Sequence, residues 1–357
     1  MRDRSIMTIG FLFLFALHST AIDGPRVSPQ APPNNPEIGG KTLDEWIKLI
    51  EDRDPSVREN AIRMVGQLGG AAKRAVPALT RQLATPNDLS PLASAIVAIG
   101  LIVPDDAEHV KKVVTALLPL LGHDQHIIRY QAAMTAGNIG PAARATIDRL
   151  TPMIKSPHSW ELRRAAAFAL GRVGRDDMNF PDMRALKALV DGIDDPHCRE
   201  VRIEALKGII DLGPPPQPQH QSELRHMLEQ RIKADKDKVA GIWVRVALLR
   251  MDAGANSNIF INDIAKNLKS NDLSLAADAA RGLGACGVLA KSKIPDLIEA
   301  MKSSDVTLTY WCAWALGRMG PDASAALPAL NALLQSADAN VKSAAQEAMK
   351  EINTPKK

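Results

Sequence analysis

Apolar residues recur along most of the chain at the three- and four-residue spacing of a helix, and this pattern returns in one segment after another. The segments that share it are DPSVRENAIRMVGQLG (54–69), IIRYQAAMTAGNIG (127–140), ELRRAAAFALGRVG (161–174), LAADAARGLGACG (275–287) and TLTYWCAWALGRMG (307–320). Because such positions fall on one side of a 3.6-residue turn, each segment predicts an amphipathic helix. The chain is therefore expected to be all-α.

These helices belong to a repeat with a period of 31 to 43 residues. Counted from Arg58, the equivalent residues, here called the marked positions, are Leu92, Arg129, Arg163, Arg202, Arg245, Ala276, Thr309 and Lys342. A period in this range is typical of a solenoid, whose units bury their apolar faces only against neighbouring units. We predict one right-handed α-solenoid (superhelix) of about nine antiparallel helix pairs over residues 41–353, followed by a tail, 354–357.

Glycine, proline and aspartate hold fixed places in the repeat. Glycine pairs such as Gly284 and Gly287 close each helix, because glycine tolerates the left-handed backbone of a helix end. A proline then suits the first turn of the second helix of a unit. Aspartates four residues before the marked positions are predicted to cap the next helix: Asp54, Asp88, Asp272, Asp305 and Asp338. Arginine at five marked positions predicts a ladder of Asp–Arg pairs between neighbouring units.

The stretch GLGACG (282–287) also matches the glycine spacing of a dinucleotide-binding loop. That function requires a strand before the glycines and a helix after them, so that backbone amides reach the phosphates. Here the glycines end a helix in register with the other repeats, and Gly282 is an extra glycine without an assigned role. We interpret the stretch as a helix terminator.

The repeat resembles HEAT repeats, in particular the short HEAT-like repeats of the phycobilisome-lyase type, written D-P-x-V-R-x-x-A-A-x-A-L-G-x-L-G followed by A-V-P-A-L-x-x-L-L. The resemblance runs from about Lys41 to Ile352. The block KTLDEWIKLIEDRDPSVRENAIRMVGQLG is also similar to the start of exported bacterial HEAT-repeat proteins. The resemblance implies architecture more than activity. It keeps open an alternative function, a lyase or isomerase acting on a chromophore.

One segment departs from the repeat. Residues 213–245 open with four prolines in five positions and lengthen the local period to 43 residues. We expect an enlarged loop over 213–220, followed by helices over 221–233 and 238–251.

The first forty residues predict export. Arg2 and Arg4 precede the apolar run 6–17, and small residues up to Ala21 suit cleavage, so residues 1–21 are predicted to be a signal peptide cut after Ala21. The run is shorter than the roughly 20 residues that span a bilayer, so no membrane span is expected after processing. Residues 22–40, rich in Pro, Gly and Asn, are predicted to be a linker. The protein is thus expected to be periplasmic or secreted.

Charge and cysteine content exclude several classes. Without the signal peptide, 42 Lys and Arg residues are interspersed with 39 Asp and Glu residues, a formal charge of +3. Nucleic-acid binding needs clustered cations, so it is not expected. The three cysteines, Cys198, Cys286 and Cys312, form no pair with metal or disulfide spacing.

No motif of hydrolases, zinc proteases, nucleotide-driven enzymes or EF-hands is present, so we expect no catalytic residues and no cofactor. The best metal candidates lie in turns between helices: His123, His126, His158, His197 and Cys198. Neighbouring turns should lie about 10 Å apart, too far for shared tetrahedral ligation, so these are interpreted as polar turn residues and no metal site is predicted.

Aromatic and cationic residues gather on the helix side expected to line the concave face. They stand one or two, five, or nine residues after a marked position and include, as predicted binding residues, Tyr130, Arg164, Phe168, Arg172, Arg250, Arg281, Tyr310, Trp311, Trp314 and Arg318. Such residues dominate protein interfaces, because they combine rigid buried area with oriented polar contacts. We therefore predict a non-catalytic scaffold that binds a protein or peptide of the cell envelope. An envelope glycan-binding module, in which the aromatics stack on sugars, is a further alternative, and packing between units is a competing role for the same side chains.

Overall fold

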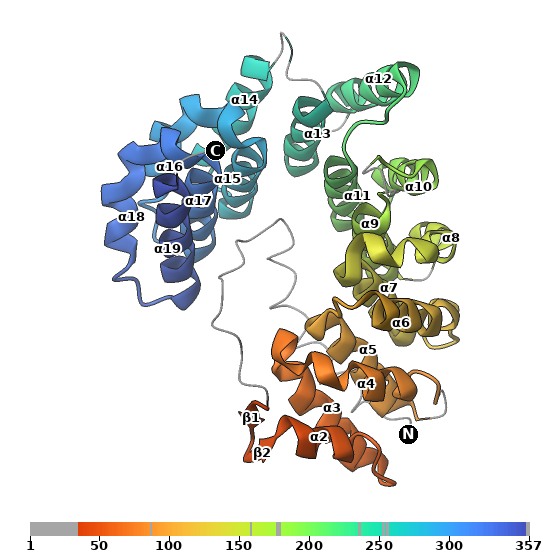
Figure 1. Cartoon of the computed structure of the whole chain (residues 1–357). Helices are drawn as coiled ribbons and strands as arrows, with labels where there is room; N and C mark the ends of the chain where they lie inside the picture. The colour runs from red at the N-terminus through yellow and green to blue at the C-terminus, as the bar shows by residue number, and fades with distance from the viewer. Residues whose placement is uncertain are drawn as a thin grey trace, which may run out of the picture. The chain divides into compact units, whose positions relative to one another are not determined.

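The computed structural model describes residues 35–354, except 86–87, 158, 176–179, 235–236, 252–253 and 255–256. The predicted signal peptide (1–21), residues 22–34 of the predicted linker and residues 355–357 of the tail lie outside this part. Within it, the chain is an all-α solenoid in which helices of two layers alternate along the sequence (Figure 1).

The first layer contains the marked positions, one in each helix. In the described part of the chain its helices are α3 (Pro55–Gln67), α5 (Leu89–Ile102), α7 (His126–Ile139), α9 (Trp160–Val173), α11 (Arg199–Leu212), α13 (Lys238–Met251), α15 (Leu273–Cys286), α17 (Val306–Met319) and α19 (Ala339–Asn353). Each helix contacts the next one in this order, so the layer is continuous from α3 to α19.

The second layer consists of shorter helices, several of them entered through a 3-10 turn. Its elements are α2 (Leu43–Leu49), η1 (Gly69–Ala75) with α4 (Val76–Gln82), α6 (Ala107–Leu120), η2 (Gly140–Thr146) with α8 (Ile147–Leu150) and η3 (Thr151–Lys155), α10 (Met183–Ile193), α12 (Pro218–Ala234), α14 (Ser257–Ala265) with η4 (Lys266–Lys269), η5 (Gly287–Lys293) with α16 (Ile294–Ala300), and η6 (Gly320–Ala326) with α18 (Leu327–Leu333). Each pairs with the first-layer helix that follows it. The described residues thus contain the nine pairs that the repeat predicts.

A short hairpin precedes the first helix pair. Strands β1 (Glu37–Ile38) and β2 (Lys41–Thr42) pair antiparallel, and the indole Nε1 of Trp46 donates to the carbonyl of Ile38 at 2.9 Å. The turn uses Gly39 and Gly40, both with positive φ. Residues 37–40, predicted to belong to the linker, are therefore part of the folded unit, because their glycines form a hairpin turn instead of a flexible tether.

Glycines have two separate roles at the ends of first-layer helices. Gly287 follows α15 with φ 57°, so GLGACG ends a helix, as predicted, and no strand precedes it. Gly284 instead permits close packing, since a Cβ there would lie 2.4 Å from Cζ3 of Trp314. Gly282 also has a packing role, which the sequence did not predict: a Cβ there would lie 2.8 Å from Cγ2 of Ile242 in α13.

The proline-rich segment is shorter as a loop than predicted. Helix α12 begins at Pro218, so the loop ends at residue 217 and not at 220. Proline is well suited to a first helical position because its missing N–H is not needed there. The following helix, α13, has the predicted bounds, 238–251.

The run Leu273–Ala300 has the length and apolar composition of a membrane span. It is not one straight helix, because Gly287 breaks it into α15 and a η5–α16 segment. Helix α15 packs between α13 and α17, so this run is a core element of the solenoid.

Aspartates cap first-layer helices as predicted at four of the five positions. The carboxylates of Asp54, Asp272, Asp305 and Asp338 each accept a hydrogen bond from a backbone amide in the first turn of the next helix. Asp88 makes no such cap, because its carboxylate is paired with Arg58 of the preceding unit.

The predicted Asp–Arg ladder exists in part. Arg58 pairs with Asp88, Arg163 with Asp195 and Arg202 with Asp237, each across one unit. Arg129 instead donates to the backbone carbonyls of His123 and Asp124, at 2.5 and 2.9 Å. Arg245 lies 3.5 Å from Asp263 in α14, within the second layer. Arg129 therefore lacks the predicted inter-unit pair, and Arg245 pairs with an aspartate of α14 instead of one in the turn before α15.

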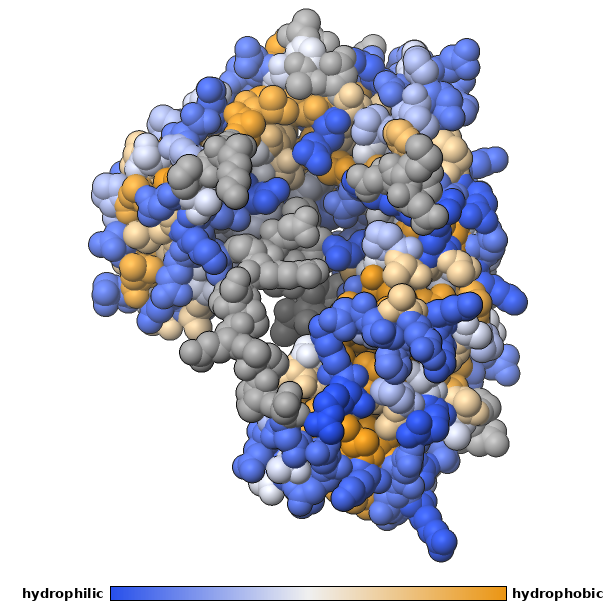
Figure 2. Space-filling view, in the orientation of Figure 1, coloured by the Kyte–Doolittle hydropathy of each residue, from blue (hydrophilic) through white to orange (hydrophobic). Residues whose placement is uncertain are grey.

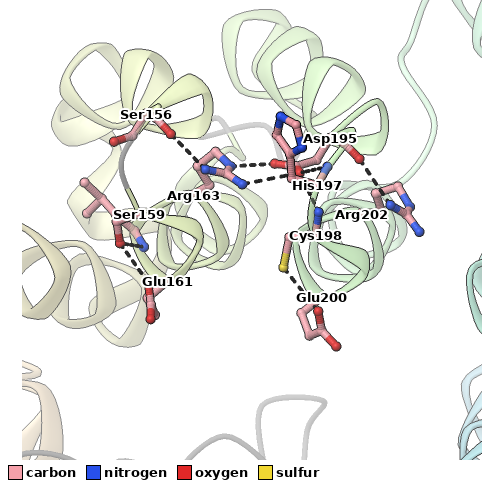
Figure 3. A network of polar contacts seen from close by, with 10 residues as sticks. Ser156, Ser159, Glu161, Arg163, Asp195, His197, Cys198, Glu200 and Arg202 are labelled. Carbon is pink, nitrogen blue, oxygen red and sulfur yellow. Dashed lines mark hydrogen bonds and ion pairs between the residues drawn. The ribbon is translucent and has the colours of Figure 1, made fainter.

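The Arg163–Asp195 pair is the most buried ion pair of this ladder (Figure 3). Asp195 also accepts from the backbone amides of His197 and Cys198 at 3.0 and 2.8 Å, so one carboxylate holds the turn that precedes α11 and binds Arg163 of α9. Burial opposes ionisation, but Arg163 and the two amides together hold the pKa of Asp195 below its ordinary value of 3.8.

We expect Gly284→Ala to destabilise the protein by about 1–3 kcal/mol, because the added methyl group displaces Trp314. The control is Gly241→Ala in α13, where the new Cβ meets only the guanidinium end of Arg245. That change should be neutral or stabilise by up to about 1 kcal/mol. Urea unfolding followed by circular dichroism measures both, and equal effects would contradict the packing role of Gly284.

We expect Arg163→Met to lower the free energy of unfolding by about 3–5 kcal/mol at pH 6, because it leaves Asp195 buried without its partner. The folded-state pKa of Asp195 is lowered, so the stabilisation is present above pH 3.8 and lost as the pH falls through the folded value. The difference between parent and variant should therefore shrink towards pH 3.

The control is Arg81→Met, which removes an exposed pair with Glu51 whose side chains are 61% and 51% exposed. Its expected cost is at most about 1 kcal/mol. An Arg163→Met effect that is the same at pH 3 and pH 6 would show that the ion pair is not its source.

Candidate binding site

All ten predicted binding residues lie on first-layer helices, in two groups. Helices α7 and α9 carry Tyr130, Arg164, Phe168 and Arg172, and helices α13, α15 and α17 carry Arg250, Arg281, Tyr310, Trp311, Trp314 and Arg318. Arg250 and Arg318 are exposed, Trp311 is buried, and the others are half-buried. The ten residues therefore form two groups with different degrees of burial, and not the one uniform surface that was predicted.

The group on α7 and α9 consists of cation–aromatic pairs. Arg172 lies 5.8 Å from the ring centre of Phe168 and donates to the carbonyl of Gly137 at 3.2 Å. Phe168 packs against the same glycine, since a Cβ on Gly137 would lie 2.6 Å from the Phe168 ring. Phe168 and Arg172 thus join α9 to α7, and packing is part of their role.

Arg164 and Tyr130 form the more accessible part of this group. Arg164 lies 5.8 Å from the ring centre of Trp160, whose side chain is 42% exposed. It also hydrogen-bonds the Tyr130 hydroxyl, although burial outweighs this and raises the pKa of Tyr130. These side chains form a cation–aromatic surface at the first turns of α9.

The second group is organised by a row of cations and aromatic rings that crosses four consecutive first-layer helices. Lys207 Nζ of α11 lies 4.7 Å from the ring centre of Trp243 of α13. Arg281 of α15 lies 5.5 Å from the same ring and 4.5 Å from that of Trp311 of α17. We call Lys207, Trp243, Arg281 and Trp311 the cation–π row. All these distances are within the range of cation–π attraction.

Trp243 is the member that sequence reasoning missed. It stands two residues before a marked position, away from the offsets of the predicted binding residues, and is fully buried. Its indole Nε1 donates to Asp278 of α15 at 3.2 Å. Lys207 and Arg281 share the same offset of five on helices α11 and α15, and this common offset was the available signal.

Further aromatic side chains extend the row on α17. The Tyr310 and Trp314 rings each meet Trp311 edge-on, at centre distances of 4.9 and 5.5 Å. Trp314 also rests on Gly284 of α15, and Arg318 lies 6.0 Å from its ring. Trp311 and Trp314 therefore pack between units, while Tyr310 and Arg318 remain accessible on the same helix.

The cations of the row have no anion in contact. No carboxylate of the described residues lies within ion-pair distance of Lys207 or Arg281, whose positive charges therefore remain uncompensated at close range. Burial, and then repulsion from Arg281, lowers the pKa of Lys207 to about 8. Burial also lowers the pKa of Arg281 and raises that of Tyr310.

Two hollows open between the first turns of neighbouring first-layer helices. One, of about 380 Å³, lies between α15 and α17 and is lined by Ser274, Asp278, Arg281, Asp305, Thr307 and Trp311, among others. The other, of about 430 Å³, lies between α9 and α11 and includes Trp160, Arg163, His197, Cys198 and Glu200. Both are open and mixed in polarity, and Figure 2 likewise shows mostly polar residues with separate apolar patches.

The turn residues considered as metal ligands have other roles. His123 Nδ1 accepts from the amide of Gln125 at 3.1 Å, and the Cys198 thiol, whose pKa is raised by burial, lies 3.1 Å from a Glu200 oxygen (Figure 3). His158 lies outside the described residues. Among those that are described, no three His, Cys, Asp or Glu side chains are grouped as metal ligands would be.

These features define the class of protein as an α-solenoid with a cationic and aromatic surface on its first layer. A model of HEAT repeats matches residues 93–171 and 261–350. The chain thus contains HEAT repeats, as the sequence pattern indicated. No curated protein sequence matches the chain.

Solved structures similar to the chain include other helical repeat proteins. The complex of CpcE and CpcF of phycocyanin lyase from Nostoc sp. PCC7120 is 18% identical, with a TM-score of 0.47 over 92% of this chain and 100% of that chain. Importin beta is 13% identical, with a TM-score of 0.49 over 87% and 47%. An engineered protein is 21% identical, with a TM-score of 0.45 over 88% and 89%.

We expect Lys207 to titrate near pH 8 in ¹³C NMR of labelled lysine side chains, with Lys207→Arg identifying its signal. Arg281→Gln should raise the pKa of Lys207, because it removes a neighbouring positive charge. Glu204→Gln should lower it, because Glu204 stabilises the ammonium form. A Lys207 signal that titrates at the ordinary value of 10.5 would contradict the burial described for this side chain.

Proposed function

We propose that the protein is a non-catalytic scaffold that binds a protein or peptide partner through the first layer of its solenoid. The observation that carries this proposal is the cation–π row, in which two cations on separate helices lie without a contacting carboxylate beside accessible aromatic and arginine side chains. Buried charges in proteins are normally paired, so an unpaired set at a surface favours a partner that supplies the missing charge.

The solenoid supports this function because its surface is formed in advance. Successive helices contact each other along the whole first layer, and the row spans four of them. A surface that needs little reordering loses little conformational entropy on binding, so more of the contact energy appears as affinity. Repeat proteins use extended surfaces of this kind for binding.

The geometry favours a protein partner over a glycan. Sugar stacking needs a free aromatic face, whereas Trp243 lies against Lys207 and Arg281, and Trp311 lies against Arg281. The absence of the catalytic motifs considered in the sequence is the basis for proposing a scaffold instead of a chromophore lyase. The predicted signal peptide is likewise the basis for proposing a partner in the cell envelope.

A charge-reversal experiment tests the proposal. Arg250→Glu with Arg318→Glu changes two exposed cations on α13 and α17, two of the helices that carry the row, and should leave the fold intact, because neither is buried. We expect at least about a tenfold loss in the capture of partners from envelope extract, because like charges across an interface repel.

The matched control is Lys187→Glu, an exposed cation on α10 in the second layer, which should capture as the parent does. Equal capture by all three proteins, at equal helicity and melting temperature, would argue against the first layer as the docking surface. Visible absorbance after co-expression with a tetrapyrrole would favour the lyase function instead, and retention on insoluble envelope polymer would favour the glycan module.

A further inference from the structure

We propose that Lys207, Arg281 and Tyr310 form a subsite for the carboxylates of an acidic segment in the partner peptide. This inference rests on the proposed function and specifies the chemistry of the ligand. The three side chains come from α11, α15 and α17, and the indoles of Trp243 and Trp311 lie beside them.

Arg281 has a hydrogen-bond donor that the described residues leave unused. Arg281 Nε is buried and has no hydrogen-bond acceptor among the described residues. Three other arginines also have a buried Nε without a hydrogen bond, namely Arg144, Arg202 and Arg245. Each of these three lies within ion-pair distance of a carboxylate. Arg281 is the member of this set that pairs with no carboxylate of the described residues, so its guanidinium is the one whose charge a ligand carboxylate would balance.

The subsite contains three hydrogen-bond donors, and no acceptor among the described residues contacts them. The Lys207 ammonium, the Arg281 guanidinium and the Tyr310 hydroxyl all lack a hydrogen bond to the described residues, and each of these residues as a whole is half-buried. Carboxylate oxygens accept several hydrogen bonds at once, and those from ionised donors are the strongest. The two cations lie against the same Trp243 ring, so neighbouring acidic residues of one peptide can reach both.

The electrostatics of the subsite favour a carboxylate over a phosphate. Burial is the main cause that lowers the pKa of both Lys207 and Arg281, so the positive charge at these sites is poorly compensated. Glu204, Asp278 and Asp211 act on the pair from beyond contact distance. Their negative field disfavours a doubly charged phosphate more than a carboxylate, so we assign the subsite to Asp or Glu side chains.

The experiment compares two labelled peptides, octaglutamate and octaglutamine, both amidated at the C-terminus, by fluorescence anisotropy with the purified protein. We expect octaglutamate to bind at least about tenfold more tightly. Lys207→Gln and Arg281→Gln should each weaken octaglutamate binding by about tenfold, while Lys207→Arg should stay within about threefold of the parent. At pH 6, where Lys207 stays protonated, Glu204→Gln should strengthen binding several-fold, because it removes a repelling carboxylate.

The matched control is Arg63→Gln, an exposed arginine at the same offset of five in α3. It removes one positive charge and should change the affinity by less than about twofold. If Arg281→Gln or Lys207→Gln does not fold, as judged by circular dichroism, the folded Lys207→Arg and Glu204→Gln variants decide the matter.

Three results would overturn the subsite: equal binding of the two peptides, an equal effect of Arg63→Gln and Lys207→Gln, or tighter binding of an octamer carrying phosphoserine. The third would assign the site to phosphate. Failure here leaves the scaffold proposal standing if Arg250→Glu with Arg318→Glu still abolishes partner capture. Conversely, octaglutamate binding without any capture of a partner from envelope extract would support the subsite and contradict the scaffold proposal.

Discussion

Close contact between consecutive first-layer helices is the constraint on which the rest of the structure depends. Gly137 and Gly284 stand at the same place in their repeats, and each lies beneath an aromatic ring of the next helix, Phe168 or Trp314. A side chain at either glycine would displace the ring above it and weaken the contact between the two helices. The small residues of the repeat are therefore conditions for packing and not only helix terminators.

Two kinds of polar contact then connect the units, and they occur in different parts of the chain. Ion pairs between a marked arginine and a carboxylate of the next unit join units as far as Arg202 and Asp237. Beyond this point Arg245 pairs with Asp263 of the second-layer helix α14, and the later marked positions are not arginine. The cation–π row begins at Lys207, where the ladder ends, and continues to Trp311. A cation–π contact thus replaces an ion pair between units. The cation in such a contact is still able to form an ion pair with an anion.

In the proposed function, stability and binding involve the same residues. Trp243, Trp311 and Trp314 bury large rings between helices, which fixes the positions of Lys207 and Arg281. The ordering cost of these long side chains is met by folding, so a partner encounters them already placed. The proposed function combines the two roles that compete in the sequence: the rings pack between helices, and the cations beside them would bind the partner.

The sequence by itself determined the all-α class, the HEAT repeat, the glycine helix ends and four aspartate caps, because each follows from local spacing or from interactions within a few residues. It also identified the helices that carry the candidate site, since their offsets are regular. Only the tertiary structure decided which partner each long side chain takes: Asp263 for Arg245, Arg58 for Asp88, and Trp243 for both Lys207 and Arg281. These partners lie about one unit apart along the chain or within an irregular unit, so the distance between them depends on unit length and helix packing. A repeat whose period varies from 31 to 43 residues does not fix that distance in advance.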